Sequence, residues 1–244
     1  MQFIHLKKFR LVILLFIVFD SIGQNIRVVA PANHAWYTTN GITKINKKFG
    51  FFHDFQFRRA DLAPQSQQYL FRGALVYNAN DKVQLFGGYA FVRTFPYGDF
   101  PVKTDFDEHR LWEQIQIKQS LGKFTYINRF RLEQRFLGDS NIGGFQNHRF
   151  ENRIRYMARL NYPFTVKLYG YVYDEIFMNF GRKVTNNDFD QNRLGAMLGY
   201  KITPKISLEA GYLNQFVKQR RRTTTFQNIY ENNHTLMVSA VTSF

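Results

Sequence analysis

The chain contains no cysteine, so no disulfide bond is available to close its fold. Beyond residue 23 no stretch approaches 18 consecutive apolar residues, and this excludes transmembrane helices. The histidines beyond that point show no metal-ligand spacing, and the chain has neither a Gly-x-Ser-x-Gly elbow nor a compact His-x-Ser pair. The sequence therefore predicts no metal, no cofactor and no enzymatic activity.

The N-terminal residues have the composition of a secretory signal peptide. A basic segment ending at Arg10 precedes an uninterrupted apolar run over 11–19, which is too short to span a bilayer as a helix. Small residues favour cleavage before Gln24, with an uncleaved anchor as the alternative. We expect a signal peptide over residues 1–23 and a single exported domain over residues 24–244.

The charge of the chain is strongly positive. Its formal net charge is +15, and removing a signal with three Lys/Arg and one Asp leaves 30 basic and 17 acidic side chains, a net charge of +13. In a cytosolic protein this charge would suggest nucleic acid. Export makes nucleic acid a poor partner and favours the anions found outside the cell, which include acidic sugars, lipopolysaccharide phosphates and small solutes.

Apolar and charged residues alternate with a period of two, which is the pattern of β-strands. Between 124 and 136 the apolar residues share one face and the charged residues share the other, and 148–162 repeats the arrangement. Similar segments recur throughout the chain, mostly with the ten or so residues that a tilted transmembrane strand needs. We predict strands at 34–45, 49–60, 67–78, 83–95, 108–119, 124–137, 147–161, 165–180, 189–200, 206–218 and 229–244.

The connections between these segments alternate in length. Tight turns containing Asn, Asp, Gly or Pro follow every other strand, and longer polar loops follow the remaining ones, near 61–66, 96–107, 138–146, 181–188 and 219–228. Short periplasmic turns and longer external loops are typical of outer-membrane barrels. The sequence thus predicts an all-β fold, a single antiparallel up-and-down transmembrane barrel.

The number of strands depends on the segment before residue 34. If the chain ends in the periplasm, the strand at 34–45 must run downward, so an earlier segment has to carry the chain up. Residues 24–31 are the only candidate. We therefore predict about 12 strands, with ten strands, or eleven strands and a threaded segment, as alternatives.

The chain closes on an amphipathic strand that ends in Phe244. Such a terminal aromatic resembles the signal that barrel-assembly machinery reads in outer-membrane proteins, and Phe244 is therefore the predicted assembly signal. A soluble lipocalin-like barrel with an aromatic core inside is the alternative architecture. The terminal phenylalanine and the alternating loop lengths argue against that alternative.

Arginine and glutamate gather on the face opposite the apolar one. The predicted lumen-lining or binding residues are Arg58, Arg72, Arg129, Arg131, Glu133, Arg135, Arg149, Glu151, Arg153, Arg155 and Arg193, with Arg159 and Glu209 on the same face. They form either an ion-pair lattice that fills the lumen or an electropositive channel wall, since guanidinium groups suit carboxylates and phosphates. The Arg220-Arg221-Arg222 run is predicted to lie in an external loop, as a solvated turn or a site for lipopolysaccharide phosphates.

A series of short motifs carries a resemblance to a known family. The order of Glu108-His-Arg-Leu-Trp-Glu-Gln114, Arg131-Leu-Glu-Gln-Arg-Phe136, Phe150-Glu-Asn-Arg153, Tyr173-Asp-Glu-Ile-Phe177 and Phe189-Asp-Gln-Asn-Arg193 resembles an uncharacterised family of outer-membrane barrels, domain of unknown function 2490. The resemblance implies a barrel from about Trp36 onward and brings no catalytic residue.

The sequence leaves three functions open. The first is a narrow, anion-preferring outer-membrane channel for small acidic solutes. The second is a closed structural or interaction barrel whose external loops bind lipopolysaccharide or a partner. A lipid hydrolase is a distant third.

Overall fold

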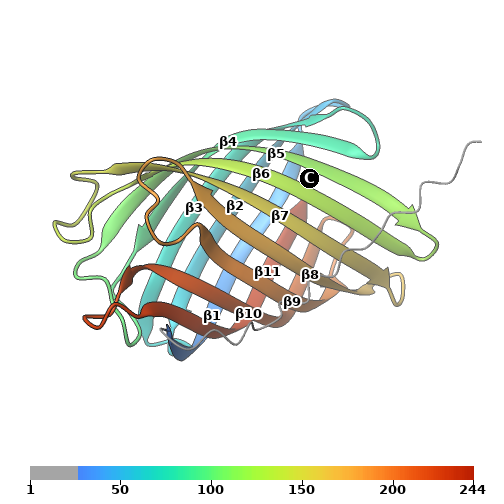
Figure 1. Ribbon diagram of the computed structural model, residues 1–244. Coiled ribbons are helices and arrows are strands. Elements are labelled where there is room, and N and C mark those ends of the chain that lie inside the picture. The colour runs from blue at the N-terminus through green and yellow to red at the C-terminus, as the bar shows by residue number, and fades with distance from the viewer. Residues whose placement is uncertain (1–26) are drawn as a thin grey trace, which may run out of the picture.

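The computed structural model describes residues 27–244 as one closed β-barrel (Figure 1). The expected signal peptide lies outside the described residues. Within them no helix is long and apolar enough to cross a membrane. The strands are β1 (Arg27–Lys44), β2 (Phe49–Ala60), β3 (Gln65–Asn78), β4 (Val83–Thr94), β5 (Phe106–Leu121), β6 (Phe124–Leu137), β7 (Arg149–Pro163), β8 (Leu168–Phe180), β9 (Phe189–Lys201), β10 (Ile206–Arg222) and β11 (Asn228–Ser243).

The described residues form 11 strands, and the prediction of 12 was wrong. Residues 27–31, expected as part of a separate short strand, continue directly into the 34–45 segment, so that both belong to β1. The first seven residues of β1 pair with β11 alone, because pairing with β2 starts at His34. Pro31 lacks an N–H group and is tolerated in a strand at such an unpaired edge. Continuous pairing with β11 therefore leaves no turn between the two predicted segments.

An odd number of strands determines how the barrel closes. Each strand pairs antiparallel with its neighbour in sequence, but β1 and β11 run in the same direction and pair parallel. The register of the closed barrel is found by stepping from Lys44 on β1 to its paired residue on β2 and then from strand to strand as far as β11. The residue of β11 reached in this way pairs with Ala30 on β1, so the register is shifted by 14 residues around the barrel. A shift of this size makes the strands tilt strongly against the barrel axis, by roughly 40°.

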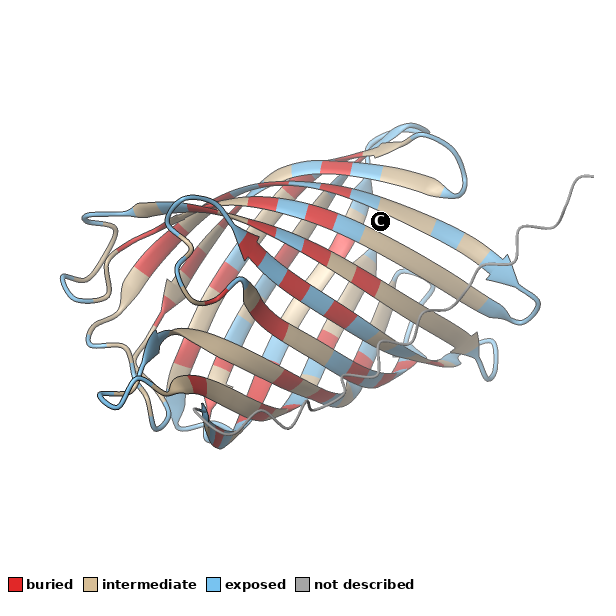
Figure 2. Ribbon diagram, viewed as in Figure 1, coloured by how far each residue is buried: buried red, intermediate tan, exposed pale blue. Residues whose placement is uncertain are grey.

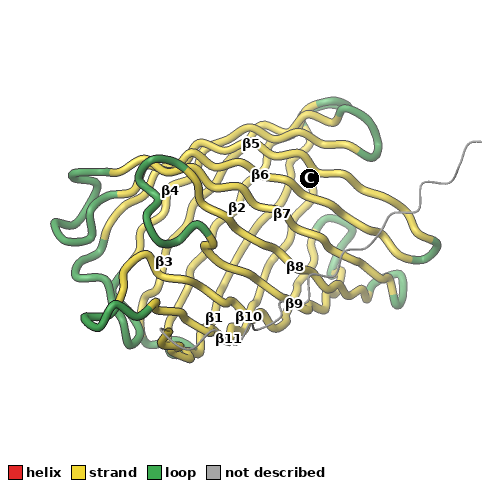
Figure 3. Tube along the Cα trace, viewed as in Figure 1, coloured by secondary structure: helices red, strands yellow, loops and turns green. Residues whose placement is uncertain are grey.

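The two ends of the barrel carry different connections (Figure 3). Turns of two to four residues lie at the end where the chain terminates, which we call the short-turn end. The long-loop end carries the segments 95–105, 138–148, 181–188 and 223–227 and the start of β1. The predicted alternation in length holds with one exception, because the connection at 61–64 is as short as a turn.

Burial alternates along each strand (Figure 2). Most outward-facing residues are apolar, whereas the inward-facing ones include most of the arginine and glutamate side chains of the strands. In β6, Phe130 is 45% exposed on the outer wall, whereas its neighbour Arg131 is 3% exposed within the lumen. Every strand presents large apolar side chains on the outer wall. This arrangement is the reverse of a soluble barrel with an apolar interior, and it gives the barrel the outer surface of a lipid-embedded protein.

The C-terminal residue is tied to β1 by backbone hydrogen bonds and not by side-chain packing. The N–H of Phe244 donates to the carbonyl of Ile42 at 3.1 Å, and its own carbonyl accepts from the N–H of Lys44. The side chain of Phe244 remains 52% exposed. The ring therefore contributes little to the packing of the closed barrel.

Replacing Phe244 by alanine is expected to reduce the amount of assembled barrel in cells, while the refolded protein loses less than about 1 kcal/mol of stability. The backbone bonds persist in this variant, whereas the aromatic ring that the sequence predicts to be the assembly signal is lost. Assembly is measured as heat-modifiable barrel in membrane fractions. Val166→Ala, which trims an apolar side chain that is 88% exposed in a turn at the same end, is the control. Equal amounts of the Phe244 variant and the control would contradict the assembly role.

Candidate functional site in the barrel lumen

A continuous chain of ion pairs covers the β6–β9 side of the lumen. Glu133, 1% exposed, accepts hydrogen bonds from Arg153 Nε at 2.8 Å and Arg155 Nη1 at 2.6 Å. Arg155 also donates through Nε to Glu175 at 2.9 Å, and Arg153 donates through Nη1 to Asp190 at 2.8 Å. Buried charges persist only when they are paired and hydrogen-bonded, and this chain satisfies both conditions.

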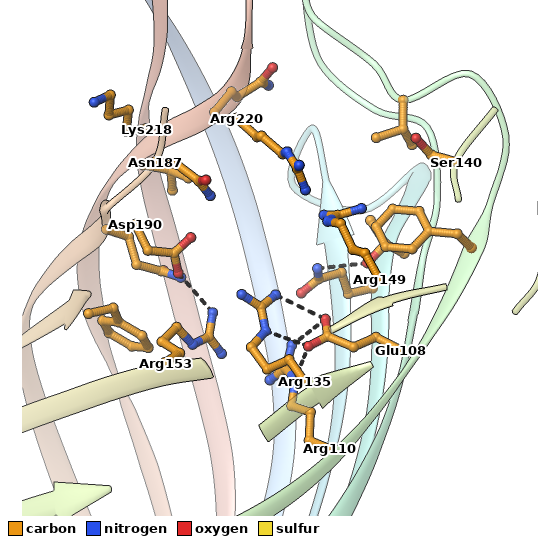
Figure 4. A pocket seen from close by; sticks show the side chains of 18 of the residues that line it. Glu108, Arg110, Arg135, Ser140, Arg149, Arg153, Asn187, Asp190, Lys218 and Arg220 are labelled. Carbon is orange, nitrogen blue, oxygen red and sulfur yellow. Dashed lines mark hydrogen bonds and ion pairs between the residues drawn. The ribbon is translucent and has the colours of Figure 1, made fainter. Parts of the chain in front are cut away.

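A second group of ion pairs lies on β5 and β6, closer to the long-loop end. Both Glu108 oxygens accept from Arg110, at 2.6 and 2.9 Å, and both accept from Arg135, at 2.5 and 3.1 Å (Figure 4). Figure 4 also shows Arg153 directed toward Asp190, which lies two strands away on β9. A single carboxylate, that of Glu108, is thus shared by two guanidinium groups, and the group of three side chains keeps one net positive charge.

Nine of the eleven predicted lumen residues belong to such ion pairs. Arg129 pairs with Glu175 at 2.7 Å, Arg149 pairs with Glu151 at 2.8 Å, and Arg131 lies 3.8 Å from Glu133. Arg72 pairs with Asp54. For these nine residues the structure shows the ion-pair lattice, one of the two arrangements that the sequence left open.

Arg58 and Arg193 are the remaining two, and the structure places them apart from the lattice. Neither has a carboxylate within 4.0 Å among residues 27–244, and both lie close to the ring of Trp36. Trp36 and the carboxylates Asp54, Glu108 and Asp190 were not predicted from the sequence as lumen residues. The sequence signal that could have identified them is the alternation along each strand, in which they take inward-facing positions.

The Arg220-Arg221-Arg222 run differs from its prediction as an external loop, because it forms the last residues of β10. Arg220 reaches across the lumen and donates to Glu151 at 2.7 Å. Arg221 donates to the carbonyl of Pro101, and Arg222 donates to Asn186. Each arginine of the run is thus hydrogen-bonded to another group of the same chain.

A cavity of about 1320 Å³ occupies the half of the lumen toward the long-loop end. Its lining contains 14 arginine and lysine side chains and four carboxylates. Four further carboxylates behind the lining, Asp54, Glu133, Glu151 and Glu175, pair with lining arginines, so the wall keeps an excess of positive charge after internal pairing. In a lumen with low-dielectric walls, such an excess raises the local concentration of anions. The cavity extends from the loops down to Trp36, Arg155 and Phe177.

The loop between β4 and β5 crosses the mouth of this cavity. Its residues Tyr97 and Phe100 line the cavity, and Gln219 on the opposite wall donates to the carbonyl of Phe100 at 3.3 Å. The ring of Tyr97 packs edge-on against His34, with 5.6 Å between centroids. Burial raises the pKa of the Tyr97 hydroxyl above its ordinary value, and the nearby Glu231 carboxylate raises it further, so the hydroxyl stays neutral. The loop narrows the entrance and closes part of it.

Aromatic side chains fill one side of the lumen below the cavity. Phe52 contacts both Phe86 and Trp112 with centroid distances of 6.0 Å, and Val76 beside them is fully buried. Phe52 and Phe86 are each the fourth residue of their strand, counted from the short-turn end. This cluster therefore lies between the basic cavity and the short-turn end, and it narrows the lumen there.

The inward residues opposite this cluster are tyrosines and one glutamate. Glu209 accepts hydrogen bonds from the hydroxyls of Tyr169 at 2.7 Å and Tyr171 at 2.6 Å. Arg159, which was predicted to face inward, lies over the ring of Tyr171 at 3.4 Å and donates to Asn161. No group of His, Asp or Glu side chains within residues 27–244 is arranged to hold a metal ion.

The strand pairing and the lumen define a single-chain β-barrel with a charged interior. A family model described as protein of unknown function (DUF2490) matches residues 33–226. The chain belongs to this family, in agreement with the resemblance seen in its motifs. None of the curated proteins matches the chain.

One solved structure that matches this chain is that of the NanC porin. It is 8% identical to this chain, and the match covers 81% of this chain and 92% of the porin chain, with a TM-score of 0.47. The barrel architecture of this chain is established by its own strand pairing.

Proposed function

We propose that this protein is an outer-membrane β-barrel that gives small anionic solutes a narrow path through the membrane. The apolar outer wall present on every strand supports the membrane location, because only a closed barrel satisfies all strand hydrogen bonds within lipid. The expected signal peptide and the terminal Phe244 direct the chain to the same location. The proposed partners are outer-membrane lipid, lipopolysaccharide and the barrel-assembly machinery.

The positive cavity is the observation that carries the proposal of anion preference. Ions are selected in pores by rings of side-chain charge, and a wall rich in arginine excludes cations while attracting carboxylates and phosphates. Solutes would enter past the β4–β5 loop, collect in the cavity and pass the aromatic cluster around Trp112. The cluster sets a low conductance, because its side chains must move for a solute to pass.

A closed barrel with a structural or binding role is the second candidate. The ion-pair lattice and the packing of Phe52, Phe86 and Trp112 support it, since both occupy part of the lumen and link neighbouring strands. In that case the cavity binds anions without passing them on. Conductance separates the two candidates, because only the first one carries current.

Removing positive charge from the cavity mouth is expected to lower the preference for anions. Lys103, Arg182 and Lys183 line the cavity and are exposed. Changing all three to glutamine therefore removes positive charge and leaves every carboxylate of the ion-pair lattice with its partners. The reversal potential under a salt gradient should shift toward the cation side, because the local potential depends on nearby unpaired charge. It is measured on refolded protein in planar bilayers.

The control removes the same charge from the other end of the barrel. Lys47, Lys48 and Lys82 lie in exposed turns at the short-turn end, and changing them to glutamine should leave the reversal potential nearly unchanged. An equal shift in both triple variants would show that the cavity does not determine selectivity. Cation preference of the wild-type barrel would contradict the proposed function itself.

A further inference from the structure

Two arginines and a tryptophan form a distinct group within the cavity. Arg58 on β2 lies over the ring of Trp36 on β1, with 3.9 Å from the guanidinium carbon to the ring centroid. Arg193 on β9 lies 5.1 Å from the same centroid and 4.7 Å from the ring of Phe177. The two guanidinium carbons are therefore no more than 9.0 Å apart, the sum of their distances to the Trp36 centroid.

The partners of these two arginines are neutral, in contrast to the carboxylates that hold the lattice. Arg58 donates to Gln56 at 2.6 and 3.0 Å and to Gln68 at 2.6 Å. Arg193 donates from Nε to Gln191 at 3.0 Å. Its two terminal nitrogens make no hydrogen bond within residues 27–244 and face a lumen that the cavity reaches.

Two like charges within 9.0 Å, neither of them in an ion pair, are a costly arrangement in a poorly solvated lumen. A bound anion removes the cost, because it offsets both charges and accepts the hydrogen bonds that Arg193 leaves unused. Guanidinium groups bind carboxylates and phosphates through two parallel N–H···O bonds, a geometry that lysine does not offer. The arrangement has the charge, donors and access that an oxyanion site needs.

We propose that Arg58 and Arg193, supported by Trp36, bind the oxyanion group of a small solute at the floor of the cavity. The ligand class is a carboxylate or a phosphate, since both present the oxygens that a guanidinium fork recognises. Trp36 holds both arginines in place through cation–π contacts, and its indole Nε1 donates to Gln67 at 2.8 Å, which fixes the ring. The site rests on the proposed function and deepens it, because it names the group on the solute that the lumen recognises.

The fluorescence of Trp36 reports binding at this site directly. The chain has two tryptophans, so Trp112→Phe leaves Trp36 as the only one. The refolded full chain in detergent is titrated with sodium acetate and, separately, with sodium phosphate, against sodium chloride at constant ionic strength. A saturable change in Trp36 fluorescence with acetate, with phosphate or with both supports an oxyanion site and identifies its preferred group. Absence of saturable change with either anion overturns the proposal.

Variants of the two arginines test where the anion binds. Arg193→Gln and Arg58→Gln should each weaken binding about tenfold or more, because each removes a charge-assisted hydrogen bond. Arg159→Gln is the matched control, since Arg159 is also an inward arginine held by a neutral partner and an aromatic ring but does not line the cavity. Its affinity should stay within about twofold of the parent.

Heat-modifiable migration establishes first that each variant is folded. If Arg193→Gln does not fold, Arg193→Lys keeps the charge but loses the planar fork, and it should still bind more weakly than the parent. Affinities unchanged in every Arg58 and Arg193 variant that folds would refute the assignment.

Failure of this inference is separable from failure of the proposed function. Saturable binding to a barrel that carries no current would remove the channel and retain the site. Anion-selective current together with an unaltered anion affinity in the arginine variants would retain the channel and remove the site.

Discussion

Replacing Glu133 by glutamine is expected to destabilise the barrel by about 3–5 kcal/mol, the usual cost of breaking a buried ion pair by removing one partner. Glu133 is 1% exposed and accepts from both Arg153 and Arg155, with Arg131 at 3.8 Å. Glutamine has nearly the same shape but no charge, so three guanidinium groups lose a shared counter-charge. Urea unfolding of the refolded barrel in lipid vesicles measures the change.

The matched control is Glu113→Gln, on the strand next to Glu133. Glu113 is exposed on the outer wall, where it accepts one hydrogen bond from Gln134 at 3.0 Å. Glutamine at 113 removes a charge that faces lipid, so its stability should be unchanged or higher. Equal stability of the two variants would show that the lattice does not hold the barrel together.

The lattice also changes what is expected from neutralising Arg129, Arg131, Arg153 and Arg155 together. From the sequence alone, the glutamates expected to lose their partners in a closed lattice are Glu133 and Glu151, which alternate with these arginines. In the structure Glu133 would indeed lose its arginine partners. Glu151 would keep Arg149 and Arg220, whereas Glu175 would lose both Arg129 and Arg155. These four positions are therefore unsuitable for a test of selectivity alone.

Phe130→Arg is expected to block insertion or to cost about 2–4 kcal/mol, the penalty of an arginine that faces lipid near the bilayer midplane. Phe130 is the seventh residue of the 14-residue strand β6, and its exposed ring packs against Tyr156 with 4.8 Å between centroids. The yield of folded barrel after refolding into lipid vesicles measures the effect.

Arg131→Gln is the control, one residue along on the inner wall. Glu133 keeps Arg153 and Arg155 in that variant, so folding should be tolerated. Single cysteines at 130 and 131 test the register independently, because the chain has no cysteine of its own. Labelling of 131 by lipid-soluble reagents and of 130 by water-soluble ones would show that the two faces are inverted.

Local patterns predicted the strands because each strand's own sequence sorts apolar and charged residues onto two faces. The segments expected at 124–137 and 49–60 match β6 and β2 residue for residue. The strand count failed because the parity argument required an upward segment before residue 34. Residues 27–31 instead continue into β1, which pairs parallel with β11 and gives an odd number of strands.

The site was predictable as a face but not as a set of contacts. The arginine rows on β6 and β7 and the glutamates Glu133 and Glu151 among them were visible. Three further partners, Glu108, Glu175 and Asp190, lie on β5, β8 and β9, at separations that no local pattern encodes. The pairing of Arg153 with Asp190 and the contact of Arg193 with Trp36 join residues 37 and 157 positions apart. The division into paired and unpaired arginines emerges only when the barrel closes.

The central claim is that the lumen forms an anion-preferring path, and single-channel recording of the refolded wild-type barrel tests it most directly. In planar bilayers under a salt gradient, we expect small discrete conductance steps and a reversal potential on the anion side. A barrel that is folded and inserted but carries no current, or one whose reversal potential lies on the cation side, would contradict the claim.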